Sequence, residues 1–365
     1  MAKIAIDARE IGTSTGRYVE RLIHYLQKID KNNDYLILLK PDDYKTWEPE
    51  SKNFTKILCT AKEFSLEEQT MLNKQLKELK PDLVHFAMVQ QPVMYKGRTV
   101  TTMHDLTTTR FVNPAKNKIV FKFKQQIYKK VNWFVPKKSK YIITPSEFVK
   151  EDIINFANVK PNKIIVTYEA ADEIITPAEP INELRGKPFI FYVGRPQPHK
   201  NLKRLIEAFA LLNKNNPDLL LVLGGRKDSV YESYLNVAKE CGVEKSVIFT
   251  GYVSEGQLKW LYRTCKAYVF PSLSEGFGLP GLEAMLNRAP VVSSNATCLP
   301  EIYGSAAWYC DPYIVEDIAN SIEEVLTNSV LRNRLIRSGR EQAKKYSWQR
   351  MAEQTLEVYK KALRK

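Results

Sequence analysis

The chain has 365 residues, a length that predicts two domains at about 100–200 residues each. Hydrophobic residues make up 44% and charged residues 26%, which is typical of a globular protein with sizeable cores. The five cysteines have no C-x-x-C spacing, and only four histidines are present as further metal ligands. We therefore expect neither a disulfide framework nor a zinc site. The N-terminus has no signal-peptide apolar region, and the longest apolar run, 219–223, is too short to span a membrane, so we expect a cytoplasmic protein.

The formal net charge is +14. An excess of this size keeps a protein soluble, and it is also typical of proteins that meet an anionic partner. Nucleic acid, a phosphorylated ligand and a membrane surface are the candidate partners, and the position of the charge along the chain has to distinguish them.

Short apolar runs alternate with amphipathic stretches in the first half of the chain. The run at 3–7 predicts a strand, and a loop rich in Gly, Thr and Ser leads from it to a helix over 17–29. Ser65 and Glu68 have capping-box spacing, which predicts one helix from there to about 79. Further strands are expected at 35–39, 56–59, 83–86, 100–103 and 141–144.

The hydrophobic periodicity is lost at 173–187, a stretch that contains Pro177 and is followed by Pro188. We interpret this stretch as a linker. The alternation then restarts and ends in polar amphipathic helices over 316–365. Strands alternating with helices predict parallel sheets covered on both faces. The fold class is therefore α/β, with two Rossmann-like doubly wound domains facing across a cleft. We expect domains at 1–172 and 188–345, and a helix at 346–365 that returns to the first domain.

Two segments of the first domain carry candidate ligand groups. Residues 12–17 (GTSTGR) follow the first strand and resemble a phosphate-cradling turn, although no G-K-[ST] follows and a plain turn capped by Thr15 is an equal alternative. His104, in TMHDL, follows a later strand and could bond a sugar hydroxyl or stabilise charge near a reacting carbon. His85 is similarly placed with less support.

The second domain opens with GRPQPHKN at 194–201, directly after its first strand. Arg195 offers a two-pronged fork for an anion, and Lys200 offers a point charge. Both lie at the carboxyl end of a strand, where open α/β sheets bind ligands. The pair therefore predicts a phosphate site.

The segment SEGFGLPGLEAM at 274–285 connects a strand to a helix. Gly276 and Gly278 let backbone N–H groups approach a ligand, and the N-terminus of the following helix favours a diphosphate. Glu275 and Glu283 bracket the turn and can accept hydrogen bonds from sugar hydroxyls. The same segment matches G-x-G-x-x-G, but we discount a dinucleotide fingerprint because of Pro280 and the position late in the domain.

Taken in order, GR(x)4KN, GYVSEGQLKWLY, E(x)7E and PVVSSNATCLPE resemble the retaining glycosyltransferases of GT-B fold in family 4. GTSTGRYVERL and TMHDL resemble the N-terminal loop and histidine motif of that family. The resemblance covers essentially the whole chain.

The resemblance implies a role for each matching residue. Arg195 and Lys200 would bind the diphosphate, Glu283 the ribose, and Glu275 the donor-sugar hydroxyls, while His104 would contact the sugar near the reaction centre. The remaining expected donor-binding residues lie in the N-terminal loop, the base-binding turn and the glycine-rich turn: Gly16, Tyr252, Val253, Gly276, Phe277, Gly278 and Leu279.

The resemblance also implies transfer of a hexose, of mannose or glucose type, with retention, from a nucleoside diphosphate donor to a saccharide or lipid-linked hydroxyl. Ser254 stands where some guanine-nucleotide users have an aspartate, so the base stays open, and GDP-mannose is favoured narrowly over a UDP-hexose. The chain has no D-x-D triplet, so we expect no metal and no cofactor. A sugar-nucleotide epimerase of the same fold and a basic nucleic-acid-binding protein are the alternatives, although no nucleic-acid module is evident.

The excess charge is concentrated at 116–140, which holds nine lysines and no acidic residue among its aromatic side chains. As a helix, it places Val120, Phe123, Ile127, Val131 and Phe134 on one face. That face can pack on the sheet of the first domain while the lysines are solvated. Like charges without counterions nevertheless favour an anionic surface, and each lysine contributes about 1 kcal/mol near an anionic leaflet. We therefore expect peripheral binding to the inner face of the cell membrane through this segment.

Overall fold

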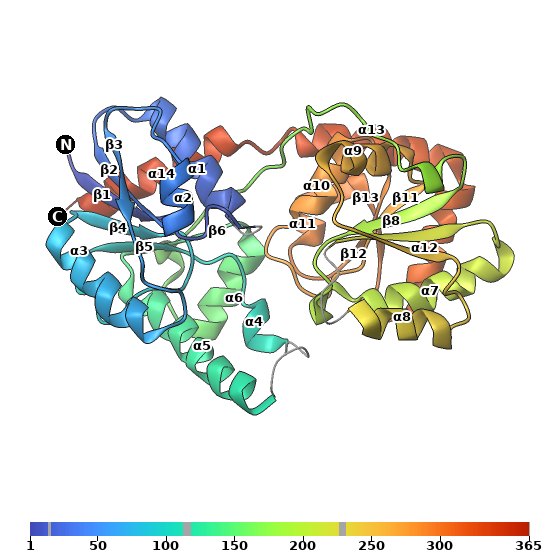
Figure 1. Ribbon diagram of the computed structural model, residues 1–365, viewed down its shortest axis with the longest axis horizontal. Helices are drawn as coiled ribbons and strands as arrows, with labels where there is room; N and C mark the ends of the chain where they lie inside the picture. The colour runs from blue at the N-terminus through green and yellow to red at the C-terminus, as the bar shows by residue number, and fades with distance from the viewer. Residues whose placement is uncertain (14–15, 112–117, 226–230, 365) are drawn as a thin grey trace. The chain divides into compact units, whose positions relative to one another are not determined.

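A computed structural model describes residues 1–13, 16–111, 118–225 and 231–364, with side chains in the helix at 118–138 described from Lys124 onward. The chain divides into two compact units. Unit 1 comprises residues 1–109, 124–169 and 347–365, and unit 2 comprises 110–123 and 170–346. The prediction of two Rossmann-like α/β domains is confirmed by the sheet in each unit (Figure 1).

Unit 1 contains a seven-stranded parallel sheet with the order β3-β2-β1-β4-β5-β6-β7. Its strands are β1 Lys3–Asp7, β2 Asp34–Leu39, β3 Phe54–Leu58, β4 Leu83–Phe86, β5 Thr99–Thr102, β6 Tyr141–Thr144 and β7 Ile164–Val166. Its helices are α1 Arg17–Ile29, α2 Pro41–Thr46, α3 Asn73–Leu79, α6 Glu147–Ala157 and α14 Trp348–Leu363, with short helical turns η1 Glu68–Leu72 and η2 Pro161–Lys163. Helices α4 Thr107–Arg110 and α5 Lys118–Lys138 belong mostly to this unit, and residue 110 and residues 118–123 are assigned to unit 2.

Unit 2 contains a six-stranded parallel sheet with the order β10-β9-β8-β11-β12-β13. Its strands are β8 Phe189–Val193, β9 Leu220–Gly224, β10 Val247–Gly251, β11 Ala267–Phe270, β12 Val291–Ser294 and β13 Ala307–Cys310. Its helices are α7 Leu202–Asn215, α8 Tyr231–Glu240, α9 Glu255–Thr264, α10 Leu279–Leu286, α11 Leu299–Tyr303, α12 Val315–Thr327 and α13 Ser329–Ala343, with short turns η3 Asn182–Leu184, η4 Pro198–Lys200 and η5 Gly304–Ala306.

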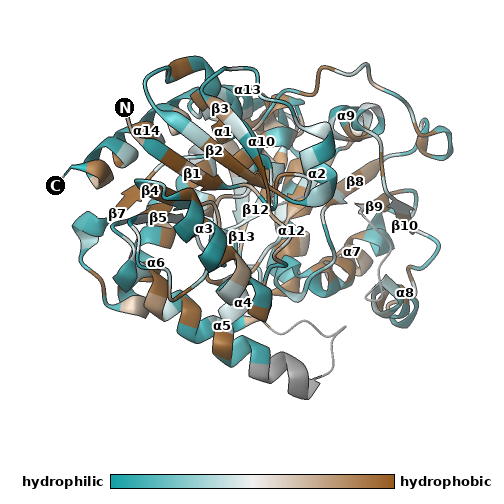
Figure 2. Cartoon of the chain, turned by 60° about the vertical axis from the view of Figure 1, so that its left-hand side comes forward, coloured by the Kyte–Doolittle hydropathy of each residue, from teal (hydrophilic) through white to brown (hydrophobic). Residues whose placement is uncertain are grey.

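The central strands β1, β4, β5, β8, β11 and β12 are largely buried on both faces, as expected for parallel sheets covered by helices, whereas the edge strands β3, β7 and β10 are partly exposed. Figure 2 shows the resulting concentration of hydrophobic residues in strands such as β1. In unit 1 the last helix, α14, packs against α1, and its Tyr359 is fully buried. In unit 2, α7 packs against α12 and α10 against α13. These layers fix the strand ends from which the candidate site residues extend.

Three details differ from the sequence-based expectations. The helix expected from Ser65 to 79 begins with a π-helical turn, η1, before α3. The strands β7 and β13 were not predicted, because runs of three and four residues give little periodicity. The expected linker at 173–187 lies against α9. Its Glu179 accepts a hydrogen bond from Ser254, and the carbonyl oxygen of its Thr176 accepts one from Lys259.

The expected apolar face of α5 is partly wrong at the residues whose side chains are described, and the side chains of Val120 and Phe123 lie outside them. Ile127 is 48% exposed and Phe134 41% exposed, whereas Asn132 and Val135 are fully buried. Apolar residues occur around much of this helix, so periodicity alone did not determine which side faces the core. Figure 2 shows hydrophobic and hydrophilic residues alternating along the coloured part of α5.

Candidate active site

The two predicted motifs of unit 2 follow neighbouring strands. β8 and β11 pair with each other at the point where the strand order reverses. The loop after β8 carries Arg195 and Lys200, and the loop after β11 carries Glu275. In open α/β sheets, the carboxyl ends of the strands at such a switch point form the ligand site. The topology therefore explains why motifs far apart in sequence meet.

Lys200 and Glu275 form an ion pair, with Nζ and Oε1 separated by 2.6 Å. Both side chains are largely buried, at 17% and 12% exposed. The Lys200 ammonium also lies 5.4 Å from the centre of the Phe270 ring. Arg195 is exposed on the same loop. The structure thus places the cation predicted to bind phosphate next to the carboxylate predicted to bind sugar hydroxyls.

Asn201 fixes the loop that carries Lys200, and sequence analysis gave it no role. It has a left-handed backbone with φ of 62° and is only 4% exposed. Its Nδ2 donates to the carbonyl oxygens of Pro271 at 3.1 Å and Pro312 at 2.6 Å. The side chain therefore ties the loop after β8 to the loop after β11. Its position directly after Lys200 in the GRPQPHKN motif was the one feature of the sequence that could have indicated this role.

The glycine-rich turn packs on Tyr303. The Tyr303 hydroxyl donates to the carbonyl oxygen of Gly278 at 2.5 Å. A Cβ at Gly278 or Gly281 would lie 2.5 Å or 2.2 Å from the same hydroxyl oxygen, and Gly278 also has φ of 90°. Close packing and a left-handed turn therefore require these two glycines. The third glycine of the G-x-G-x-x-G match thus has a packing role that needs no dinucleotide.

The turn that precedes helix α10 is stabilised by contacts with residues later in the chain. The backbone N–H of Glu275 donates to Thr297 Oγ1 at 3.2 Å, and the Cys298 thiol donates to the Glu275 carbonyl at 3.4 Å. The buried Phe277 ring meets Tyr346 edge-to-face, with ring centres 5.3 Å apart. These contacts fix the turn at the helix N-terminus, where a positive dipole end favours an anion.

Glu283 lies in the second turn of α10 and is 9% exposed. The hydroxyl of Tyr262 donates to its Oε2 at 3.5 Å. Leu279 is the first residue of the same helix, so Leu279 and Glu283 are held by one rigid element. The two predicted glutamates therefore lie before and after the N-terminus of α10.

The expected base-binding turn follows β10. Tyr252 is 80% exposed and Val253 is half-buried. Ser254 caps α9 through a capping box, accepting from the Gln257 N–H at 3.1 Å, and its hydroxyl donates to Glu179 at 2.9 Å. Helix capping thus gives Ser254 a structural role, and recognition of the base by Tyr252 and Val253 remains a prediction.

In unit 1, Gly16 occupies the N-cap position of α1. A Cβ there would lie 1.9 Å from the Glu10 carbonyl oxygen and 2.6 Å from that of Ile11. Backbone packing therefore requires glycine, whether or not a phosphate binds nearby. The alternative of a cap by Thr15 lies outside the described residues.

His104 follows β5 and is held through both ring nitrogens. Its Nδ1 lies 3.0 Å from Glu169 Oε1, and its Nε2 lies 3.1 Å from the Ala87 carbonyl oxygen. The ring of Tyr18 meets it edge-to-face at 4.9 Å. Burial lowers the pKa of His104, but the hydrogen bond and charge of Glu169, with Asp105 and the Ala87 carbonyl, outweigh it and raise the pKa above its ordinary value.

This arrangement favours the imidazolium form, in which both N–H groups donate. An imidazolium has no lone pair with which to accept a proton, so the geometry suits His104 to stabilise negative charge and not to act as a general base. Glu169 was not predicted from the sequence; it is only 5% exposed and follows the short strand β7.

His85 has a different environment and is fully buried. Its Nδ1 lies 2.6 Å from the Tyr359 hydroxyl and its Nε2 lies 2.8 Å from Thr102 Oγ1, which in turn bonds the Tyr18 hydroxyl at 2.9 Å. Burial lowers the pKa of His85 to about 3, so the ring is neutral. His85 therefore connects β4 to α14 and the helix that carries Tyr18, which is a structural role.

In the described ranges, no three His, Cys, Asp or Glu side chains gather in a way that could hold a metal ion. No helix within the same ranges has the length and apolar character needed to cross a bilayer. The basic segment at 116–140 starts outside the described residues, and its exposed side chains on α5 include Ile127, Lys130, Trp133 and Phe134.

Comparison with known proteins links both units to one activity. Residues 174–342 match the family model Glycosyl transferases group 1, and residues 15–173 match Glycosyltransferase Family 4. The chain is 30% identical over 275 residues to O-antigen chain mannosyltransferase B of Escherichia coli, covering 72% of this chain and 70% of that protein. It is 32% identical over 235 residues to the serotype-specific mannosyltransferase WbdA of Escherichia coli, covering 61% of this chain but only 29% of WbdA.

Solved structures agree on the fold. Sucrose-phosphate synthase from Thermosynechococcus elongatus superposes with a TM-score of 0.79 at 18% identity, covering 99% of each chain. Anabaena Alr3699/HepE in complex with UDP and glucose gives a TM-score of 0.73 at 17% identity, covering 99% of this chain and 100% of the other.

Proposed function

Because the chain belongs to the GT-B glycosyltransferases of family 4, we propose that it transfers mannose from GDP-mannose to a saccharide acceptor. The observation that carries this proposal is the Lys200–Glu275 pair at the switch point of unit 2. It offers a cation to the diphosphate and a carboxylate to the sugar hydroxyls. The mannosyltransferase relatives favour mannose over glucose, and a UDP-hexose is the alternative donor. Neither the epimerase nor the nucleic-acid interpretation is favoured by these relatives.

The proposed reaction proceeds with retention at the anomeric carbon and without a metal or cofactor. The bond between C1 and the diphosphate oxygen breaks, and the acceptor oxygen bonds to C1 on the same face. The departing phosphate oxygen takes the proton of the acceptor hydroxyl. Arg195, Lys200 and the N-terminus of α10 stabilise the charge that develops on the leaving group. We propose that His104, whose pKa is raised by Glu169, contacts the donor sugar near the reaction centre, as the resemblance to the family implies.

We further propose that the enzyme acts in the cytoplasm at the inner membrane face, on a lipid-linked saccharide. The support is α5, where exposed Ile127, Trp133 and Phe134 lie among exposed lysines such as Lys130. Basic and aromatic side chains on one exposed helix are typical of attachment to an anionic surface.

A donor panel tests the assignment. GDP-mannose, UDP-glucose and UDP-galactose are each incubated with the enzyme, and hydrolysis and transfer are followed by chromatography. We expect turnover of GDP-mannose, and loss of transfer in the Arg195→Ala, Lys200→Ala double variant without loss of fold. Full activity of that double variant would overturn the diphosphate site. Preferred turnover of a UDP-hexose would overturn the donor alone.

A further inference from the structure

A basic pocket lies at the amino-terminal edge of the sheet in unit 1. It has a volume of about 460 Å³ and is lined by Lys137, Lys140, Lys160 and Lys163. Lys140 directly precedes β6, and Lys163 directly precedes β7. His104 follows the opposite, carboxyl end of β5. Since all strands of this sheet are parallel, the pocket is separated from the His104 end by the length of the sheet, about 13 Å for a four-residue strand.

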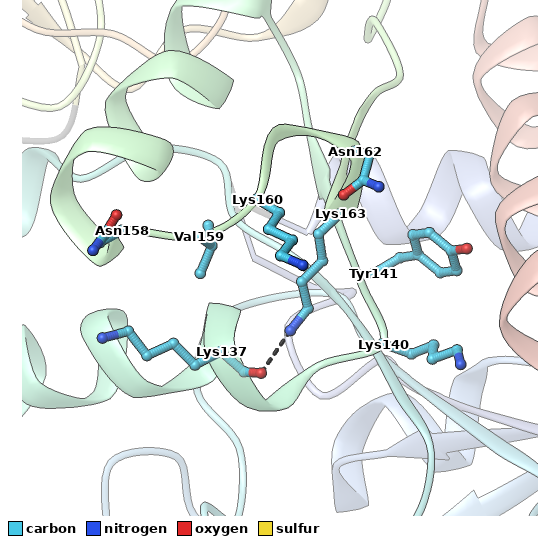
Figure 3. Close-up of a pocket in the computed structure, with 8 residues that line it drawn as sticks. All are labelled: Lys137, Lys140, Tyr141, Asn158, Val159, Lys160, Asn162 and Lys163. Atoms are coloured by element: carbon cyan, nitrogen blue, oxygen red, sulfur yellow. Dashed lines mark hydrogen bonds between the residues drawn. The ribbon is translucent and has the colours of Figure 1, made fainter.

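Three segments of the chain build the pocket (Figure 3). They are the end of α5, the start of β6, and the turn from α6 through η2. Lys163 connects two of them, because its ammonium donates to the Lys137 carbonyl oxygen at 2.6 Å. The Lys163 side chain is half-buried, and burial lowers its pKa. The amides of Asn158 and Asn162 add neutral hydrogen-bond donors to the wall.

The charge of this pocket has no counterpart within the described residues. No carboxylate lines it, and no ion pair with any of its four lysines is found there. Helix carbonyl groups attract cations, and this explains Lys163 at the end of α5. It does not explain the exposed Lys140 and Lys160, which lie beyond the ends of α5 and α6. Figure 3 shows the Lys160 and Lys163 side chains extending into the same space, where two like charges repel one another unless an anion lies between them.

We propose that this pocket binds a group carrying two or more phosphates, at a site separate from the donor diphosphate site. Lysines present point charges suited to phosphate oxygens, and the volume lies within the range of about 300–1,000 Å³ for small-molecule sites. The phosphates can belong to a soluble anion or to a lipid headgroup. The ammonium of Lys137 lies 3.1 Å from the centre of the exposed Trp133 ring, so the pocket adjoins the exposed face of α5. The proposal does not depend on the proposed function.

The test uses tripolyphosphate as the probe and the full chain as the protein. Lys140→Gln, Lys160→Gln is the pocket variant, and Lys214→Gln, Lys239→Gln is the matched control. The control removes the same charge from two exposed lysines in the last turns of α7 and α8. By isothermal titration calorimetry, we expect the pocket variant to bind tripolyphosphate at least tenfold more weakly than the control. GDP binding should be equal in both.

Equal tripolyphosphate affinity in the two variants would overturn the proposal. A second measurement needs no variant: tripolyphosphate should protect Lys140 and Lys160 of the natural chain from acetylation, as read by mass spectrometry, while Lys214 and Lys239 stay reactive. Absence of protection would also overturn it. Vesicles of phosphatidylcholine with added phosphatidylinositol bisphosphate distinguish the source: protection by these vesicles identifies a lipid headgroup, and protection by tripolyphosphate alone identifies a soluble anion.

Discussion

Lys200→Met removes an ammonium group that lies 2.6 Å from the Glu275 carboxylate and keeps most of the side-chain length. The carboxylate, only 12% exposed, then loses its cation. Breaking a fully buried pair costs about 3–5 kcal/mol, and partial exposure reduces this cost. We therefore expect the free energy of unfolding to fall by about 1–3 kcal/mol. Adding Glu275→Gln should recover part of the loss, because no uncompensated charge then remains.

The same substitution should weaken nucleoside diphosphate binding. A hydrogen bond to a charged group contributes about 1.5–3 kcal/mol, which corresponds to a rise of about 10- to 150-fold in Kd. Glu275→Gln keeps the Lys200 cation, so diphosphate affinity should be retained while sugar transfer falls. The two variants therefore separate binding of the diphosphate from binding of the sugar.

Urea unfolding and calorimetric titration with GDP and UDP measure both effects. Lys203→Met is the control, because Lys203 belongs to an exposed pair with Glu207 at 3.8 Å and is 67% exposed. Surface pairs of this kind contribute at most about 1 kcal/mol, so this control should behave like the natural chain. If Lys200→Met binds GDP and UDP as tightly as the control does, the assignment of Lys200 to the diphosphate is wrong.

Three further predictions follow from the other contacts. Glu169→Gln should lower the pKa of His104, read by NMR titration of the ring, and an unchanged titration would contradict the proposed pairing. Since the folded-state pKa of His104 is raised, its contribution to stability is present at low pH and is lost as pH rises through that pKa, and the variant should flatten this dependence. Gly281→Ala places a Cβ 2.2 Å from the Tyr303 hydroxyl and should cost about 1–3 kcal/mol in urea unfolding, with partial recovery by Tyr303→Leu. Trp133→Ser should reduce pelleting with anionic vesicles, and undiminished pelleting would argue against attachment through α5.

Local sequence pattern was sufficient for the architecture and for the position of the candidate residues of unit 2 at one edge of its sheet. The apolar run at 3–7 corresponds to β1, and the strand expected directly before residue 194 corresponds to β8. Motifs placed after such strands necessarily gather at one edge of a parallel sheet. This rule is why Lys200 and Glu275, 75 residues apart in sequence, could be assigned to one site before their contact was known.

Contacts that depend on distant, weakly patterned segments could not be predicted. Glu169 lies 65 residues from His104 and follows a strand of three residues. Tyr303 supports the glycine-rich turn from α11, and nothing in the spacing of the glycines indicates it. In α5, the choice of buried face depends on how Val135 packs into the core of unit 1, a property of the tertiary structure.

Lys200 of unit 2 and His104 of unit 1 each contact a largely buried glutamate, and the two contacts can respond differently to a ligand. Glu275 is the partner of Lys200 and is also the residue expected to bind the donor sugar, so an arriving diphosphate and hexose offer new partners to both groups at once. Glu169 is only 5% exposed and has no predicted ligand role, so its bond to His104 can persist through the reaction. We therefore expect the Lys200–Glu275 pair to open when a donor binds, whereas the His104–Glu169 contact should persist.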